Sequence, residues 1–382
     1  MQVYLDNSAT TRPFEAVIDA MDASMREVYY NPSALYAPAM LAEKELVHAR
    51  QAIADTLGAN EKNVIFTSGG TESDNLAIWG ALQGQRGRGE VLYTAAEHAA
   101  VKNACLEAES RFGCTAREIP LTTDGSVDLA ALKEMLSDAT RLICVMQVCN
   151  ETGVMMPIDE ICALRDQLAP QAAIHVDGVQ GYLREPFSFK KQKVQSYALS
   201  GHKIHGPKGV GALVLRDGYK IHPQMPGGGQ QNGMRSGTEN TCGIAGLRAA
   251  VENYPQNAPV RELKKLLVSL LREALSEMMI AGLPEDDPMS AGHILNVAFP
   301  PVRAETLLHA LEGAGVIVGT GSACSSKKGR HSAVLTAMGL KPQVMESAIR
   351  ISLCPLNTPD EMRYTAEQII QQVTLLRRFT RR

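Results

Sequence analysis

The sequence predicts an α/β protein with a mostly parallel central sheet, helices on both faces, and a second, smaller α+β domain. Short apolar runs alternate with stretches of helical periodicity, which is typical of a parallel sheet covered by helices. The length of 382 residues exceeds the ~250–300 residues at which a single core stops growing. The segment 254–260 (YPQNAPV) has two prolines and little apolar content, which indicates a boundary. We therefore expect a large domain at 14–255 and a small domain formed by 1–13 and 256–382.

The elements of the large domain follow one another along the chain. Amphipathic helices are expected at 14–28 and 39–57. Apolar runs then predict six strands, at Val64–Thr67, Val91–Ala95, Leu142–Val148, Ala173–Val176, Ser196–Leu199 and Val210–Leu215. Helical patterns separate several of these runs, at 71–82, 98–111 and 158–168. The last two strands lie too close together for a helical crossover, so we expect the final one to run in reverse.

The small domain is expected to mix helices and strands. The pattern predicts helices at 261–280, 304–314, 332–338 and about 359–378, and strands near Ile294–Phe299 and Ile349–Leu353. The last helix opens with Thr358-Pro359-Asp360-Glu361. This sequence is a capping box with proline at the first helical position.

Composition excludes several classes of protein. Hydrophobic residues make up 45% of the chain and charged residues 21%, a globular balance that argues against disorder. The net charge of -3 argues against a strongly basic nucleic-acid binder, so we expect no direct nucleic-acid binding. No apolar stretch approaches the ~18 residues of a membrane helix, and no signal-peptide pattern is visible. The eight cysteines form no CxxC pair, so we expect a reducing, cytoplasmic setting and no membrane partner.

One polar motif, TSGGTESDN at 67–75, follows an apolar strand and opens a helix. A helix N-terminus presents free N–H groups and the positive end of the helix dipole, so it holds phosphate well. Gly70 would let the backbone approach the anion closely, and Thr71 adds a hydroxyl group. The motif fits neither a dinucleotide nor a P-loop fingerprint. On this motif alone, an ordinary Gly-rich turn with a threonine cap stays open.

Two further motifs place an acid and an amine at strand ends. Asp177 ends the run AIHVD, and Lys203 follows the next run in SGHK; ligands of open α/β sheets bind at the carboxyl ends of strands. Taken singly, Asp177 could be a helix N-cap and Lys203 a solvated surface charge. Together the three motifs supply a phosphate cradle, an acid for a pyridinium nitrogen and an amine for a Schiff base, which a pyridoxal 5'-phosphate (PLP) site requires.

A zinc site is the competing interpretation of the same segments. His175 and Asp177, with His202 and His205, offer possible ligands. The HxxH spacing lies on a loop, however, and the sequence contains no HExxH motif. We therefore expect no catalytic metal.

Nine motifs in order resemble those of the cysteine desulfurases of the class V aminotransferase group, which are PLP enzymes of fold type I. The motifs run nearly end to end: YLDNSATT at 4–11, SGGTESDN at 68–75, EHAAV at 97–101, NETG at 150–153, HVDGVQ at 175–180, SGHK at 200–203, GGGQ at 227–230, RSGTEN at 235–240 and GSACSS at 321–326. The resemblance implies a fold type I enzyme that uses PLP.

The resemblance also implies roles around the cofactor ring. Lys203 would bind PLP covalently, Asp177 would pair with the pyridinium nitrogen, and Gln180 would hydrogen-bond the phenolic oxygen. His98 would stack on the ring and serve as an acid/base.

The phosphate and the substrate would be held by further matching residues. The phosphate would be bound by residues of the cradle and of the loop after it, namely Gly70, Thr71, Ser200 and His202. Thr238 of a second subunit would join them, which implies a homodimer. Asn150 would contact the ring oxygen and the substrate carboxylate, and Arg350 would clamp that carboxylate, because a guanidinium binds carboxylates in a bidentate manner.

Cys324 decides which reaction the resemblance implies. It lies in the Gly- and Ser-rich segment 319–331, which is expected to be an exposed loop. Lys327 and Lys328 nearby should lower the thiol pKa. On these surroundings alone, an incidental surface cysteine stays open. The resemblance to the long-loop subgroup implies a nucleophile that takes sulfur from L-cysteine as a persulfide, while alanine is released and Lys203 removes the Cα proton.

The sulfur would then pass to an acceptor protein, for Fe–S cluster assembly or tRNA thiolation, and the sequence does not choose between these routes. Another class V enzyme, such as an aminotransferase or a selenocysteine lyase, is the alternative with the same fold. A non-catalytic scaffold and a zinc hydrolase are alternatives of other classes. Cys324 in its loop argues for the desulfurase, because an aminotransferase has no use for it.

Overall fold

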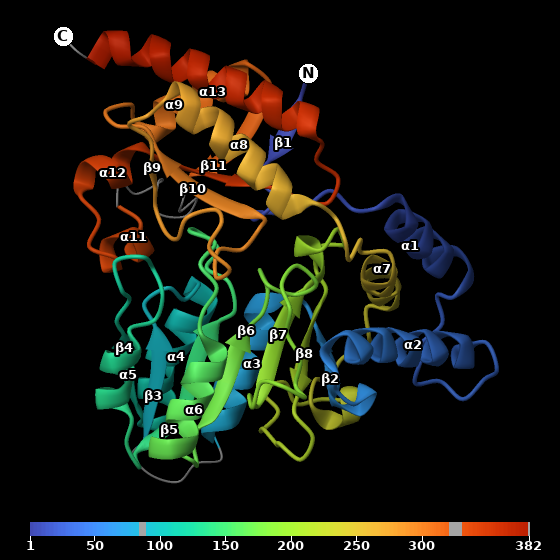
Figure 1. Ribbon diagram of the computed structural model, residues 1–382. Coiled ribbons are helices and arrows are strands. Elements are labelled where there is room, and N and C mark those ends of the chain that lie inside the picture. Colours follow the sequence, from blue (N-terminus) through green and yellow to red (C-terminus); the bar gives the residue numbers. More distant parts are fainter. Residues whose placement is uncertain (84–88, 321–330, 381–382) are drawn as a thin grey trace.

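The computed structural model describes residues 1–83, 89–320 and 331–380, and the larger of its two sheets has seven strands (Figure 1). The strand order is β2-β8-β7-β6-β5-β3-β4. The strands are β2 (Val64–Thr67), β3 (Glu90–Thr94), β4 (Thr115–Ile119), β5 (Thr140–Met146), β6 (Ala173–Asp177), β7 (Ser196–Ser200) and β8 (Gly211–Leu215). All neighbours are parallel except β8, which is antiparallel to both β2 and β7. The predicted reversal of the final strand is confirmed.

Helices cover both faces of this sheet. On one face α3 (Gly70–Gln83) and α4 (Ala99–Phe112) share a buried apolar cluster with the strands. The opposite face carries the larger core cluster, to which these helices contribute: α1 (Glu15–Glu27), α2 (Ala39–Leu57), α5 (Leu129–Met135), α6 (Ile158–Leu168) and α7 (Thr241–Glu252). Because both faces are covered, the central strands are buried along nearly their whole length and are mostly apolar. The predicted fold class is confirmed.

A second sheet of five strands, in the order β1-β11-β12-β10-β9, lies beside the first and has its own core cluster (Figure 1). Its strands are β1 (Val3–Leu5), β9 (Met279–Ile280), β10 (Ile294–Ala298), β11 (Val316–Thr320) and β12 (Ala348–Ser352). The helices of this part are α8 (Val260–Ala274), α9 (Ala304–Gly313), α11 (Ala333–Ala337), α12 (Pro342–Ser347) and α13 (Pro359–Thr380). The domain limits stay a prediction.

The start of α13 confirms the predicted capping box. The backbone N–H of Glu361 donates to Thr358 Oγ1 at 3.2 Å, and the backbone N–H of Thr358 donates to Glu361 Oε2 at 2.9 Å. No helix in the described ranges is long and apolar enough to cross a membrane.

The predicted helix at 261–280 was too long. Helix α8 ends at Ala274, and the chain then turns so that β9 pairs with β10. Strands β1, β4, β9 and β11 were not predicted. Strand β4 is an edge strand whose side chains are mostly exposed, so its sequence lacks the apolar run of a central strand.

The carboxyl ends of β6 and β7 bring polar residues together. The two strands are parallel neighbours, so Asp177, at the end of β6, and Ser200, at the end of β7, lie at the same edge of the sheet. A turn of 3-10 helix, Gly201–Lys203, continues directly from β7. The sheet therefore brings two of the predicted motifs to one place.

Gly178, the residue after Asp177, is packed so closely that a Cβ atom there would overlap the ring of the buried Tyr197. We predict that Gly178→Ala lowers the free energy of unfolding by about 1–3 kcal/mol, because overpacked cores force neighbours out of place. Thermal and urea unfolding of the purified protein would measure the change.

Gly313, in the last turn of α9, is the matched control, because a methyl group added there would meet no neighbouring side chain within 4 Å. Gly313→Ala should leave stability unchanged or raise it by up to about 1 kcal/mol. Equal stability of the two variants would contradict the packing assigned to Gly178.

Candidate functional site

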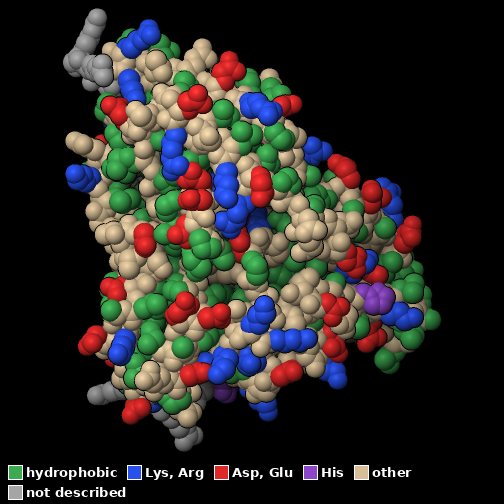
Figure 2. Space-filling view, viewed as in Figure 1, with side chains coloured by type: hydrophobic (Ala, Val, Ile, Leu, Met, Phe, Trp, Pro, Cys, Tyr) green, Lys and Arg blue, Asp and Glu red, His purple; other side chains and the backbone are tan. Residues whose placement is uncertain are grey.

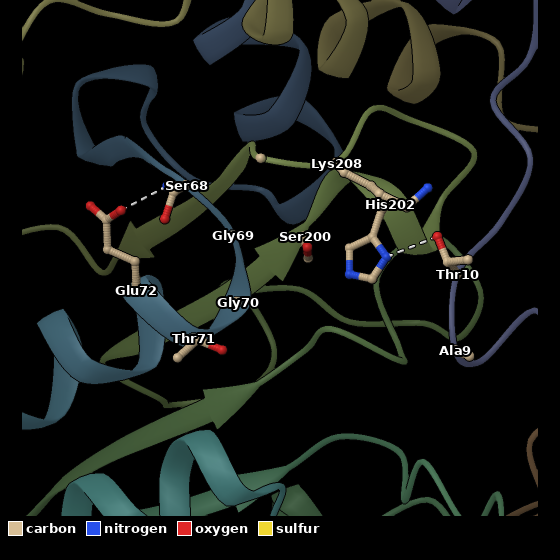
Figure 3. Close-up of a pocket in the computed structure, with 11 residues that line it drawn as sticks. Ala9, Thr10, Ser68, Gly69, Gly70, Thr71, Glu72, Ser200, His202 and Lys208 are labelled. Atoms are coloured by element: carbon tan, nitrogen blue, oxygen red, sulfur yellow. Dashed lines mark hydrogen bonds between the residues drawn. The ribbon is translucent and has the colours of Figure 1, made fainter. Parts of the chain in front are cut away.

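A cavity of about 370 Å³ lies where the start of α3 meets the turn after β7 (Figure 3). Its walls come from the N-terminal segment, the α3 start and the segment after β7. The lining residues are Ala9, Thr10, Ser68, Gly69, Gly70, Thr71, Glu72, Ser200, His202, Lys208 and Gly209. Four predicted phosphate-binding residues, Gly70, Thr71, Ser200 and His202, thus share one cavity. Thr238 is exposed and does not line it.

The α3 end of the cavity needs its two glycines. Gly69 has a φ of +149°, which side chains rarely adopt. A Cβ on Gly70 would lie 2.6 Å from Val179 Cγ2, in the loop after β6. The Glu72 carboxylate accepts from the Ser68 amide at 2.9 Å and pairs with Arg235 at 2.8 Å. These contacts fix a helix start whose free N–H groups favour an anion.

His202 contributes a neutral ring to this cavity. Burial, with further contributions from Lys203 and Lys208, lowers the pKa of His202 to about 4. Its Nδ1 lies 3.2 Å from Thr10 Oγ1, as the dashed line in Figure 3 shows. At neutral pH this residue can therefore offer a hydrogen bond but no charge.

Lys203 lies partly buried at the end of the 3-10 turn after β7. Its Nζ donates to two backbone carbonyl oxygens of the N-terminal segment, those of Ser8 at 2.5 Å and Ala9 at 2.8 Å. Burial lowers the pKa of Lys203 to about 7, and the nearby Arg184 and Arg350 guanidinium groups act in the same direction. A lysine with this pKa is a ready nucleophile and base near neutral pH.

Asp177 faces the same region from the end of β6. Burial raises its pKa, and the Val179 amide, which donates to Oδ1 at 2.9 Å, opposes that shift together with the charges of His98 and Lys203. The structure therefore brings Asp177, Lys203 and His98 within electrostatic reach of one another. His98 caps α4 by accepting from the Ala100 amide, and it is exposed, so one side of its ring is open to a ligand.

The Gln180 side chain is buried, and both its amide nitrogen and its amide oxygen already form hydrogen bonds. Its Nε2 donates to the Ser8 carbonyl at 2.9 Å, and its Oε1 accepts from Arg184 at 2.8 Å. Arg184 also donates to the Lys203 carbonyl. Arg184 thus links Gln180 and Lys203, although nothing in its local sequence indicated this.

Arg350 and Asn150, the predicted substrate residues, lie together. Arg350, on β12, is buried, and its Nη1 donates to the Asn150 carbonyl at 3.0 Å. Its Nη2 is paired with Asp6 at 2.8 Å. Neither Asp6 nor the carbonyls of Ser8 and Ala9 received a role from the sequence, even though all three lie in the YLDNSATT motif.

Two buried carboxyl groups near the site were also missed. Glu97 accepts from the Thr94 hydroxyl and the Met146 amide, and burial raises its pKa to about 8. Glu151 accepts from the Ser332 hydroxyl, and burial raises its pKa to about 7. Glu97 directly precedes His98, and Glu151 directly follows Asn150. This position next to a predicted site residue was the only sign in the sequence that either carboxyl group belongs near the site.

The histidines considered as zinc ligands have other partners. His175 is buried between Ser196 and Asp74, and burial lowers its pKa to about 3. His205 Nδ1 bonds the Arg12 carbonyl. Within the described ranges, no group of three or more His, Cys, Asp or Glu side chains is arranged to hold a metal ion.

Cys324, the predicted nucleophile, lies outside the described residues. The described parts of its segment are Gly319 and Thr320 at the end of β11, and His331 before α11. Cys144, Cys149 and Cys162, by contrast, are buried in the core.

Comparison with known proteins places the chain in a family. The Aminotransferase class-V family matches residues 3–364. A cysteine desulfurase of Nostoc sp. is 36% identical over 97% of this chain and 90% of its own length. A solved NifS-like protein superposes with a TM-score of 0.89 at 34% identity, covering 98% of this chain and 100% of that one. A structure described as SspA in complex with cysteine has a TM-score of 0.81 at 30% identity, covering 94% and 100% respectively.

The family match spans every strand of both sheets and every described residue of the site. They agree with the family suggested by the motifs. The chain therefore belongs to the class-V aminotransferase family, among its cysteine desulfurases.

Proposed function

We propose that this protein is a PLP-dependent cysteine desulfurase that converts L-cysteine to L-alanine and holds the sulfur as a persulfide on Cys324. The observation that carries the proposal is the partly buried Lys203, whose Nζ donates to the Ser8 and Ala9 carbonyls and whose pKa is lowered to about 7 beside Asp177. The amine lies at the carboxyl end of the sheet, one residue from a lining residue of the anion cavity. The cysteine desulfurase relatives and the cysteine-bound relative support the substrate.

The described residues fit the cofactor. The cavity at the α3 start has the size and donors for a phosphate group, with Thr71, Ser200 and His202 on its walls. Lys203 would hold PLP covalently, Asp177 would face the pyridinium nitrogen, and Gln180 the phenolic oxygen. PLP, when bound, supplies an electron sink for charge that develops at the substrate Cα.

The chain's own residues would then orient the substrate and transfer its protons. Arg350, with Asn150 beside it, would bind the α-carboxylate and so fix the Cα–H bond toward Lys203. The Lys203 amine, released from the cofactor when substrate binds, is neutral above a pH of about 7 and would take the Cα proton at Nζ. His98, on the exposed side, would cover the ring and hold a second proton.

The sulfur transfer needs a thiolate, which none of the residues named so far supplies. The Cys324 thiolate would form an S–S bond with the substrate sulfur as the C–S bond of cysteine breaks. The electron pair left on carbon would take a proton, so that Cβ becomes the methyl group of alanine. A loop nucleophile could then deliver the sulfur to an acceptor protein, for Fe–S assembly or tRNA thiolation.

We also propose that the protein works as a homodimer in the cytoplasm. Helices α1 and α2 expose several large apolar side chains, among them Ile18, Met25, Leu41 and Val47, and exposed apolar patches of this kind mark interfaces. Thr238, exposed and away from its own cavity, would reach the cavity of the second subunit. On the face shown in Figure 2, acidic and basic side chains are interspersed, which agrees with a protein that does not bind nucleic acid directly.

Cys324→Ala should abolish alanine and sulfide formation from L-cysteine, because no thiolate would remain to accept the sulfur. The visible absorbance of bound PLP should be retained, since Lys203 is intact. Cys242→Ala, which removes a partly exposed cysteine, is the control and should keep full activity. Wild-type turnover in Cys324→Ala would refute the assigned nucleophile.

The pKa of Lys203 predicts how the cofactor-free enzyme takes up PLP. The amine becomes neutral as pH rises through about 7, so the rate of adduct formation should rise to a plateau near pH ~8. A lysine of ordinary pKa would keep accelerating through pH ~9. Arg184→Met should move the midpoint upward, because one nearby positive charge is lost. Stopped-flow absorbance recorded against pH measures the midpoint for the wild type and for Arg184→Met. An equal midpoint in the two proteins would contradict the environment assigned to Lys203.

Leu41→Glu should weaken the proposed dimer, because it puts a charge into an exposed apolar patch. Light scattering on dilution would show monomer at concentrations where the wild type is dimeric. Leu106→Glu, at a similarly exposed position on α4, is the control. A monomeric wild type would remove the dimer from the proposal.

A further inference from the structure

Arg350 is already paired with a carboxylate of its own chain. Nη2 lies 2.8 Å from Asp6 Oδ1, and Nη1 donates to the Asn150 carbonyl at 3.0 Å. Nε is buried and has no hydrogen-bond partner. A guanidinium has five N–H donors, so two are occupied, and an arriving carboxylate must bind beside Asp6 or displace it.

The fold makes room for this pair. Gly319 on β11 is the register partner of Arg350 on β12. A Cβ at Gly319 would lie 2.5 Å from Asp6 Oδ1 and 3.1 Å from Arg350 Nη2. Any side chain at this position would push the carboxylate away from the guanidinium.

Asp6 is held in place by the strand that carries Arg350. Asp6 forms an isolated bridge with Ser352, two residues beyond Arg350. The Asn7 side chain donates to the Ser352 carbonyl at 2.8 Å, and the Ser8 amide donates to Ser352 Oγ at 2.8 Å. The backbone that presents the Asp6 carboxylate is therefore fixed to the strand that carries Arg350.

A carboxylate bound at Arg350 would place a second negative charge next to Asp6. The Arg350 side chain is 6% exposed and that of Asp6 is 23% exposed, so water screens this repulsion only in part. We propose that Asp6 sets the affinity of the site for amino-acid carboxylates by sharing the Arg350 guanidinium, which weakens the hold on the product and lets it leave. This inference rests on the proposed function in that Arg350 is taken to bind the α-carboxylate.

The test is the binding of L-alanine and L-alaninamide to the PLP-loaded enzyme, measured by isothermal titration calorimetry. Asp6→Asn removes the charge but keeps an oxygen that can accept from Arg350. It should bind L-alanine roughly five- to tenfold more tightly than the wild type, as expected when a close like charge is removed. L-alaninamide has no carboxylate, so its affinity should not change.

The amide separates this effect from one acting through Lys203. Asp6 also opposes the lowering of the Lys203 pKa. A gain in affinity that came through Lys203 would appear for both ligands, whereas a gain at Arg350 appears for L-alanine alone. Asp6→Ser, also neutral, should tighten L-alanine binding in the same direction, so the test does not depend on one variant folding. Asp166→Asn, which removes the acid of an Asp–Arg pair on α6, is the control and should change neither affinity.

The variant Arg350→Gln separates the carboxylate-binding role of Arg350 from the role of Asp6. It should weaken L-alanine binding and abolish the gain from Asp6→Asn. Two results would refute the role of Asp6 and leave the proposed function standing. In the first, Arg350→Gln weakens the binding of L-alanine but neither neutral Asp6 variant tightens it. In the second, the Asp6 variants tighten the binding of L-alaninamide as much as that of L-alanine. If Arg350→Gln leaves L-alanine binding unchanged, the carboxylate role of Arg350 fails, and the role of Asp6 fails with it.

Discussion

The site depends on one stretch of backbone, Asp6–Thr11, which passes from the small sheet to the large one. Strand β1, before it, belongs to the five-stranded sheet, and α1, after it, packs on the large core. On the way, the Ser8 and Ala9 carbonyls accept from Lys203, and the Ser8 carbonyl also accepts from Gln180. The two halves of the molecule are therefore tied together at the reactive amine.

The same stretch balances the charge of the site. Arg184 and Arg350 are close enough to lower the pKa of Lys203, while Asp177 and Asp6 oppose them. The two guanidinium groups suit a ligand that carries anionic groups. This environment also explains why the amine is neutral near physiological pH: removal from water disfavours the ammonium form, and the neighbouring guanidinium groups disfavour it further.

Much of this arrangement could be predicted from the sequence. Apolar runs located the strand that ends at Asp177 and the strand that precedes Lys203. The rule that ligands bind at the carboxyl ends of strands brought both residues to one edge. The glycines of the α3 start were predicted to hold an anion, and they line the cavity with Ser200 and His202.

The rest could not be predicted, because it depends on contacts between distant segments. No local pattern assigned a role to Arg184 or Asp6, and only the folded chain places them beside Lys203 and Arg350. Strand β1 is three residues long, too short to show periodicity, yet it delivers the segment on which the site depends. The end of α8 at Ala274 was missed because the residues after it are still compatible with a helix.

The most direct test of the central claim is to find the sulfur. The enzyme would be incubated with L-cysteine without a reductant, alkylated, digested and analysed by mass spectrometry for peptides that carry one additional sulfur atom. The account predicts that atom on the peptide containing Cys324, in amounts that match the alanine formed. Alanine formation with the extra sulfur on another cysteine, or on none, would contradict it.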